Sequence, residues 1–242
     1  MPGEYYHDAA AHKLYYWPNT TRVFEGGSLQ VTLGGLEVVV AVNGTDSRRV
    51  ENITLDGLEF AHSGQSYLTQ PYEVPSNGDF AVRRAAAVFV ENAKGFTITG
   101  CKFERPGGNG LMLSNHVRFA NVSFNEVAFA GENAIVLMGT SNLNSGLGID
   151  SYPSDNFVGH NHLHHFGVWG KNSAGFLQAV GTHNTIVGNV IHSGPRSGAT
   201  FNDHFGGGNK FAGNLMFDLV RETSDVSADT FSICVCLAIV LL

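Results

Sequence analysis

Short runs of alternating hydrophobic and polar residues recur along most of the chain. Six segments can be aligned, each with an apolar residue, a short polar pair and a second apolar residue: Asn52 to Phe60, Phe96 to Phe103, Asn121 to Val127, Phe157 to Leu163, Thr185 to Ile191 and Lys210 to Met216. One column of this alignment holds Leu58, Cys101, Asn125, Asn161, Asn189 and Asn214, and its last four steps measure 24, 36, 28 and 25 residues. A period in the twenties with variable insertions is typical of a solenoid whose coils each contribute short strands.

A second set of strand-like segments follows the first after glycine-rich bends. It comprises Gly110 to Asn115, Ala134 to Gly139, Gly175 to Val180 and Gly198 to Asp203. Alternation predicts that one face of this sheet points inward, through Leu111, Leu113, Ile135, Leu137, Ala199 and Phe201, and that the intervening residues face solvent. The fold class is therefore predicted to be all-β, a single-stranded, right-handed parallel β-helix. Stacked Asn amides would then bond to one another and to turn backbone inside it.

The two ends of the chain depart from the repeat. Glu4 to His7 and Leu14 to Trp17 are aromatic runs around a polar turn, and they predict a β-hairpin within an N-terminal segment, residues 1–30. The pattern is strand-like from Val31 to Val42, and the β-helix domain is expected over residues 31–225. The apolar run from Phe231 to Leu242 has 12 residues, fewer than the roughly 20 that cross a bilayer. We expect no membrane span, and we expect residues 226–242 to be an aberrant, non-native tail.

Composition narrows the possible partners. Charged residues make up 14% of the chain and the net charge is −7, which leaves no basic surface for nucleic acid. The three cysteines, Cys101, Cys234 and Cys236, are odd in number and badly spaced for a disulfide framework or a zinc site. Met1 is not followed by a signal peptide, but four glycosylation sequons, at Asn19, Asn43, Asn52 and Asn121, suit an extracellular or secretory protein. We expect a monomer.

The stretch from Ser193 to Asn214 concentrates polar residues and glycines around Phe201. Its outward positions, Thr200 and Asn202, are predicted to face solvent just before Asp203. Two polar insertions, Ser63 to Arg84 and Gly139 to Asn156, are predicted to be structureless walls of a binding cleft beside this sheet. The alternatives are that the glycines only serve tight turns and that the insertions have no role.

Three runs make the chain resemble a known family. They are the segment from Pro75 to Arg118, the segment NVSFNEVAFAGENAIVLMG, and above all GPRSGATFNDHFGGGNKFAGNLMFDLVRETSD. These resemble the pectin-lyase-like β-helix proteins of glycoside hydrolase family 141, which act on complex plant-type polysaccharides. The resemblance covers roughly Glu4 to Asp225 and stops abruptly there, so we expect the chain to be truncated at both ends. It implies a polysaccharide or oligosaccharide as the partner.

Glycoside hydrolysis needs two carboxyl groups across the scissile bond. Asp203, at the end of one outward strand, and Asp225, near the start of the next, are the candidate catalytic pair. Asp203 could instead form an Asx turn. The candidate substrate-binding residues are Asn202, Arg196, Gln178, Asp150 and Glu222. Arg196 could also orient Asp203, and Glu222 could instead form an ion pair with its neighbour Arg221.

No cofactor and no metal are expected. His160 and His162 are predicted to share one face of a strand, beside His164 and His165, but no Cys or well-placed carboxylate completes a site in sequence. Three function classes stay open. A glycoside hydrolase is favoured by the paired aspartates, and a non-catalytic carbohydrate-binding β-helix is the alternative. A polysaccharide lyase is less supported because lysines are few and no acidic cluster for Ca²⁺ is apparent.

Overall fold

The computed structural model describes residues 4–8, 10–18, 31–67, 69, 71–75, 80–140 and 151–223, without the side chains of residues 203–205. Within these ranges the regular elements are all β-strands, and the predicted all-β class is confirmed. Among the same residues, no helix has the length and apolar character needed to cross a bilayer. The chain divides into two compact units, Met1–Leu33 and Gly34–Leu242, and each is described by itself.

The first unit contains the predicted hairpin. Strands β1 (Tyr5–Asp8) and β2 (Lys13–Tyr16) pair antiparallel, with Tyr6 opposite Tyr15. These two rings stack with their centroids 6.2 Å apart. The Asp8 carboxylate accepts a hydrogen bond from the amide of Ala11 at 2.9 Å, which is the local bonding that favours Asp in turns.

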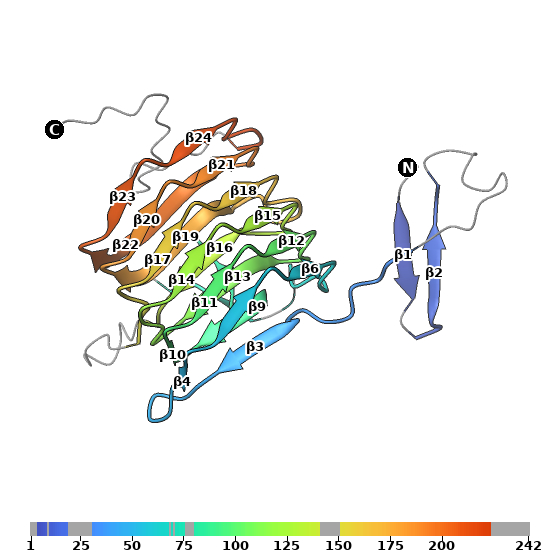
Figure 1. The fold of residues 1–242 in the computed structure, drawn as a ribbon. Coiled ribbons are helices and arrows are strands. Elements are labelled where there is room, and N and C mark those ends of the chain that lie inside the picture. The colour runs from blue at the N-terminus through green and yellow to red at the C-terminus, as the bar shows by residue number, and fades with distance from the viewer. Residues whose placement is uncertain are drawn as a thin grey trace. The chain divides into compact units, whose positions relative to one another are not determined.

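The second unit is built on three six-stranded parallel sheets, which the chain visits in turn (Figure 1). We number them in the order in which the aligned segments enter them. Sheet 1 contains β5 (Thr54–Asp56), β11 (Thr97–Thr99), β14 (Asn121–Ser123), β17 (Phe157–Gly159), β20 (Thr185–Val187) and β23 (Lys210–Ala212). Sheet 2 contains β6 (Glu59–Ala61), β12 (Lys102–Glu104), β15 (Glu126–Ala128), β18 (His162–His164), β21 (Val190–His192) and β24 (Leu215–Phe217). Sheet 3 contains β3 (Val40–Asn43), β9 (Ala86–Glu91), β13 (Asn109–Ser114), β16 (Ile135–Met138), β19 (Ala174–Thr182) and β22 (Ser197–Gly207).

Two small sheets complete the described strands. Strand β4 (Val50–Glu51) pairs parallel with β10 (Ala93–Lys94). Strand β7 (Tyr72–Glu73) pairs antiparallel with β8 (Val82–Arg83). The insertion from Ser63 to Arg84, predicted to be structureless, therefore contains a strand pair. The prediction missed it because both strands have only two residues, too few for a periodic pattern.

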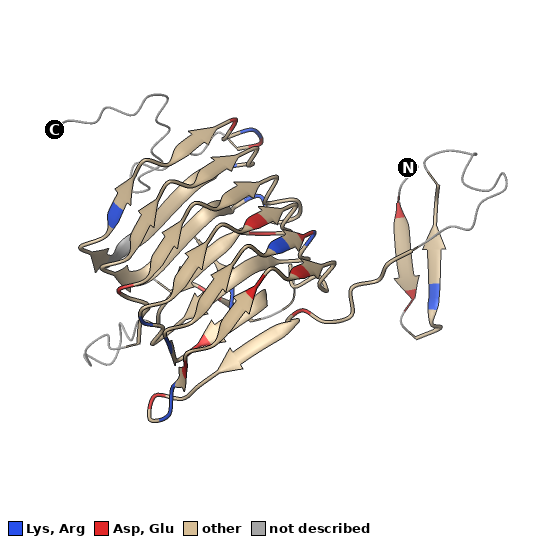
Figure 2. Cartoon of the chain, in the orientation of Figure 1, with Lys and Arg blue, Asp and Glu red and all other residues tan. Residues whose placement is uncertain are grey.

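The aligned segments of the sequence pair in the register that their alignment predicts. Thr54, Thr97, Asn121, Phe157, Thr185 and Lys210 are successive partners in sheet 1. In sheet 3 the inward set of alternating residues is buried in one continuous core, with Phe201 half-buried against it. The predicted inward positions are thus confirmed for this sheet. Most residues of the strands are uncharged, as expected for strands that face an apolar interior (Figure 2).

The predicted column of asparagines forms a buried ladder between sheets 1 and 2. The Asn161 Oδ1 accepts hydrogen bonds from the backbone and side-chain nitrogens of Asn125, both at 3.0 Å. The Asn161 side chain in turn donates to the Asn189 Oδ1 at 3.0 Å, and Asn189 donates to Asn214 at 2.9 Å. Each amide thus satisfies the polar groups that a tight corner would leave without partners. Cys101 takes the same place one pass of the chain earlier, where its amide donates to the Asn125 Oδ1 at 3.0 Å.

Two more asparagine ladders exist that the alignment did not reveal. Asn156 and Asn184 are linked at 3.0 Å, and the amide of Asn184 donates to the Asn209 Oδ1 at 2.9 Å. Asn133 donates to the Asn109 Oδ1 at 2.8 Å at the start of sheet 3. The first of these ladders has a sequence signal, because Asn156, Asn184 and Asn209 each precede a member of the predicted column by five residues.

The corners between strands are held in the left-handed backbone region. The residue before each member of the predicted column has a φ between 57° and 64°, and these residues are Gly57, Gly100, Phe124, His160, Gly188 and Gly213. Glycine adopts this conformation without steric cost, which explains why Gly-Asn recurs at residues 188–189 and 213–214. A second column of positive φ precedes the second ladder, at Asn52, Gly95, Phe119, Asp155, His183 and Gly208.

The predicted strand at Val31–Val42 is much shorter in the structure, and the predicted tail is not among the described residues. Val31 to Val42 was predicted to be strand-like, but the strand there covers only Val40–Asn43. Leu33 and Leu36, which gave the pattern its apolar positions, are exposed, and Gly34 and Gly35 interrupt it. The predicted tail, residues 226–242, lies outside the described residues. The division at residues 30 and 225 stays a prediction.

Candidate functional site

Strand β22 contains a bulge at the point where the sequence places its richest polar cluster. Asn202 pairs with Ala179, and the next pair is Gly206 with Gly181, so β22 advances four residues while β19 advances two. The backbone of Asp203 therefore lies in the bulge, opposite Val180. A bulge bends its strand and redirects its side chains, and such features are common beside active sites.

Val180 is itself in an unusual conformation. Its φ is 58°, in the left-handed region that a β-branched residue rarely adopts. The carbonyl oxygen of Val180 also approaches Gly139 so closely that a Cβ there would lie 2.4 Å from it. A conformation of this kind costs about 1–3 kcal/mol and persists only where its surroundings enforce it. The strain and the bulge thus mark one place at the end of sheet 3.

The outward face of sheet 3 is covered, contrary to prediction. Thr200 and Asn202 were predicted to face solvent, but their exposed fractions are 0% and 4%. Phe80 and Val82, from the end of the first insertion, are fully buried against this face. They form a second apolar cluster with Ala86, Met112, Val136, Met138, Ala174, Leu177 and Ala179. The insertion thus acts as a cover over the sheet.

Arg196 is buried beneath this cover. Its guanidinium lies over the ring of Phe80, 4.6 Å from the centroid, and it donates a hydrogen bond to the side-chain oxygen of Asn172. A cation over an aromatic face in a desolvated site is a stabilising contact. Arg196 therefore anchors the cover at the start of β22, seven residues before Asp203.

The other candidate contacts are placed as follows. Gln178 points into the interior, where it donates to the carbonyl of Gly181 at 2.8 Å and accepts from Asn184 at 3.0 Å. Both polar groups of the Gln178 side chain are thus hydrogen-bonded in the protein interior, so they do not face the bulge at Asp203 as sugar-binding groups. Glu222 does form an ion pair, but with Lys171 at 2.9 Å and not with Arg221. Asp150 and Asp225 lie outside the described residues, as does the side chain of Asp203.

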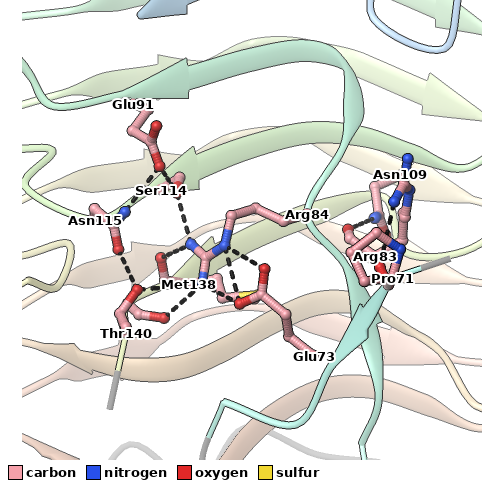
Figure 3. A network of polar contacts seen from close by, with 11 residues as sticks. Pro71, Glu73, Arg83, Arg84, Glu91, Asn109, Ser114, Asn115, Met138 and Thr140 are labelled. Atoms are coloured by element: carbon pink, nitrogen blue, oxygen red, sulfur yellow. Dashed lines mark hydrogen bonds and ion pairs between the residues drawn. The ribbon is translucent and has the colours of Figure 1, made fainter. Parts of the chain in front are cut away.

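A polar network that the sequence did not suggest lies near the same end of sheet 3 (Figure 3). Arg84 forms an ion pair with Glu73, with nitrogen–oxygen distances of 2.7 and 2.8 Å. Its guanidinium also donates to the Ser114 hydroxyl at 2.7 Å and to the carbonyl of Gly139 at 3.0 Å. Ser114 in turn donates to Glu91 at 2.8 Å. Arg84 thereby ties the first insertion to the start of the second.

The network shares a row of the sheet with Asn202. By register, Glu91, Ser114, Met138, Ala179 and Asn202 are successive neighbours along one line across the strands. The only sequence signal for Arg84 was the dipeptide Arg83-Arg84 at the end of an insertion, which gives no hint of a partner.

Glu132 is a second residue that sequence reasoning missed. It is 5% exposed, and its carboxylate accepts hydrogen bonds from the Tyr72 hydroxyl at 3.0 Å and from the Ser66 hydroxyl at 3.3 Å. Burial raises the pKa of Glu132 above its ordinary value, and the two hydrogen bonds oppose that shift. Both donors belong to the first insertion, so Glu132 is a third anchor of the cover.

The histidines gather on a different sheet. His162 and His164 alternate on β18, and His192 on β21 is the partner of His164. His160 lies in a corner and stacks on Phe124 with centroids 5.1 Å apart, so the predicted pairing of His160 with His162 on one strand face is wrong. Burial lowers the pKa of His162, and the neighbouring His164 lowers it further. The pKa of His192 is lowered by burial and then by His162.

Comparisons with known proteins show a similarity to a solved structure. No family model matches the chain, and no curated protein matches it. Among solved structures, a chain titled "Glycoside hydrolase" is similar, with a TM-score of 0.47 and 16% sequence identity. The similarity covers 89% of this chain and 56% of that one, so this chain spans little more than half of its structural neighbour.

Proposed function

We propose that this chain is a right-handed parallel β-helix and that it belongs to a glycoside hydrolase acting on a complex polysaccharide. The β-helix is supported by three parallel sheets that the chain visits in turn over six passes, each strand pairing with the strand one pass away. Ladders of asparagine at the corners are what such a coil needs to satisfy its backbone. The resemblance of residues 194–225 to family 141 supports the hydrolase.

The bulge at Asp203 is the observation on which the proposal chiefly depends. The backbone of Asp203 lies in a strand irregularity opposite the strained Val180, and irregularities of this kind are common beside active sites. An Asx turn would account for Asp203 in a regular turn, but Asp203 lies within the continuous strand β22. We therefore favour a catalytic role over a turn.

In the proposed mechanism, Asp203 and Asp225 act as the two carboxyl groups. One protonates the oxygen of the leaving sugar, and the other attacks the anomeric carbon or activates a water molecule. Arg196 supports the strand from below through Phe80 and Asn172. The proposed ligand is a polysaccharide or oligosaccharide, and the proposed setting is extracellular.

A non-catalytic carbohydrate-binding protein is the second candidate. The burial of Arg196 and Asn202 and the internal bonding of Gln178 remove three predicted sugar contacts from both candidates, so the two differ only in whether the carboxyl groups are catalytic. A lyase has less support, since none of the described contacts gives it a base with a neighbouring acidic cluster.

A panel of plant-type polysaccharides separates these classes. A hydrolase releases new reducing ends without unsaturated, ultraviolet-absorbing product, whereas a lyase generates that product. A binding protein is retarded by the polysaccharide in affinity electrophoresis and releases nothing. If no polysaccharide of the panel retards the protein or is turned over by it, all three function classes are contradicted.

A further inference from the structure

Three histidines from two neighbouring strands converge on the outer face of sheet 2. The Nε2 atoms of His162 and His192 lie 2.9 Å apart. One ring nitrogen from each of His162, His164 and His192 lies within 4.8 Å of the other two. We propose that these three histidines bind a divalent transition-metal cation of the zinc type, with Glu126 as the fourth ligand.

The ligand set suits zinc. Three imidazoles and one carboxylate are common Zn²⁺ ligands, at bond lengths of about 2.0–2.2 Å in tetrahedral geometry. Such geometry places two ligand nitrogens about 3.3 Å apart. The pair at 2.9 Å therefore needs to open only slightly, and rotation of the half-exposed rings supplies that movement.

Glu126, on the preceding strand, lies beside the cluster and outside the set of atoms that are all within 4.8 Å of one another, so its carboxylate would have to move toward His162 and His192 to bind the same ion. Glu126 is the direct neighbour of His162 in the sheet, and its Oε1 lies 3.1 Å from the Nε2 of His164. The carboxylate thus already contacts one of the three histidines. The alignment carries a signal for this partner, because Glu126 and His162 directly follow Asn125 and Asn161 in the predicted column.

A chain of hydrogen bonds behind His192 orients it for metal binding. The Ser193 hydroxyl donates to the Asp218 carboxylate at 2.8 Å, so it accepts from the Nδ1 of His192 at 2.9 Å. This leaves the lone pair of His192 on Nε2, which faces His162. Outer partners of this kind fix the tautomer of metal-binding histidines.

A stacked ladder of aromatic rings is the competing explanation. His164 and His192 stack with centroids 5.2 Å apart, and His192 stacks on Phe217 at 4.6 Å. Ring contacts involve all three histidines, since His162 lies against His164 and His192 with centroids 4.2 and 5.1 Å apart, and a hydrogen bond between the two Nε2 atoms fits the approach of His162 to His192. These contacts do not account for the chain from His192 through Ser193 to Asp218. The two explanations differ in the effect of His192→Phe, which keeps an aromatic ring but removes the ring nitrogens that would bind zinc.

Zinc titration of the metal-free full chain, made without a histidine tag, tests the proposal. We expect one Zn²⁺ per chain by calorimetry and a rise in the unfolding temperature, because the ion would join three successive passes of the chain. His192→Phe keeps a ring in the stack and should lose the zinc effect. Ser193→Ala should weaken zinc binding about 10–100-fold. His160→Asn is the matched control, since His160 is outside the cluster and Asn tolerates its left-handed conformation.

Cobalt(II) gives a readout that is independent of stability. A tetrahedral site produces intense visible absorption, which should appear with wild type and His160→Asn and be absent with His192→Phe. Absence of saturable zinc binding by the wild type, or binding that persists unchanged in both His192→Phe and Ser193→Ala, would overturn the proposal. If zinc does not raise the unfolding temperature of the wild type, and His192→Phe is as stable as the wild type, then the cluster is a stack of rings and the proposal is wrong. None of these outcomes depends on glycan turnover.

Discussion

Replacing Asn161 with alanine tests the asparagine ladder at its centre. Asn161 is 1% exposed and takes part in hydrogen bonds to Asn125, Asn189 and Val122. In Asn161→Ala the amide of Asn125 and the carbonyl of Val122 lose the partners that this side chain supplies. The Asn125 side chain keeps its bond to the carbonyl of Ile98, and the Asn189 Oδ1 keeps the backbone amide of residue 161.

The register of β14 with β17 leaves the Val122 carbonyl opposite the amide of Gly159, so the buried group left without a partner is the amide of Asn125. One such group costs about 1–3 kcal/mol, a substantial part of the roughly 5–15 kcal/mol that stabilises a typical domain. In urea the unfolding midpoint should fall by about 0.5–1.5 M. Circular dichroism and tryptophan fluorescence should be followed together, because coincident transitions establish two-state unfolding.

Asn121→Ala is the matched control. Asn121 begins strand β14, and its side chain is exposed, so the change should stay within about 0.5 kcal/mol. Equal, small effects of the two substitutions would refute the view that the ladder holds the corners together.

Two further predictions follow from single residues. Glu132→Gln should flatten the dependence of stability on pH: the pKa of Glu132 is raised by burial, so its contribution is full below the ordinary value of 4.5 and is lost as pH rises through the raised value. Unfolding temperatures of both proteins between pH 4 and 8 check this, and parallel curves would contradict it. Gly213→Ala should cost about 1–2 kcal/mol, because Gly213 has a φ of 63° with open space around it, so the cost is purely conformational. Gly207→Ala, also in open space but without a positive φ, should be nearly neutral in the same urea titration.

Local patterns predicted the strands and their register in the parallel sheets, but not the segment that covers sheet 3. The inward residues of sheet 3 and the Asn125 column follow from alternation and repeat length, which short segments of sequence express directly. The burial of Thr200 and Asn202 depends on Phe80 and Val82, which belong to an insertion outside the repeat. No periodicity connects residues 80 and 200, so the covered face could not be foreseen.

The candidate site shows the same division. Asp203 stood out in the sequence because it ends a polar strand, but the bulge that distinguishes it depends on the register against Ala179 and Gly181. The histidine cluster was within reach of the alignment. Extending each aligned segment by one residue places His164 and His192 in one column, as the sheet does. The ion pair of Arg84 with Glu73 had no such signal, because it joins two parts of an insertion.

The rate of glycan hydrolysis by wild type and Asp203→Asn tests the central claim most directly. Asparagine preserves the shape and the turn-forming capacity of the side chain while removing its charge and its proton transfer. Thr200→Val is the control on the same strand, since the Thr200 hydroxyl is buried without a hydrogen-bond partner and its loss should be tolerated. We predict that Thr200→Val turns over polysaccharide at the wild-type rate and that Asp203→Asn loses at least about 100-fold while still folding. Equal rates for Asp203→Asn and wild type, or binding of polysaccharide by both without any turnover, would contradict the proposed role of Asp203.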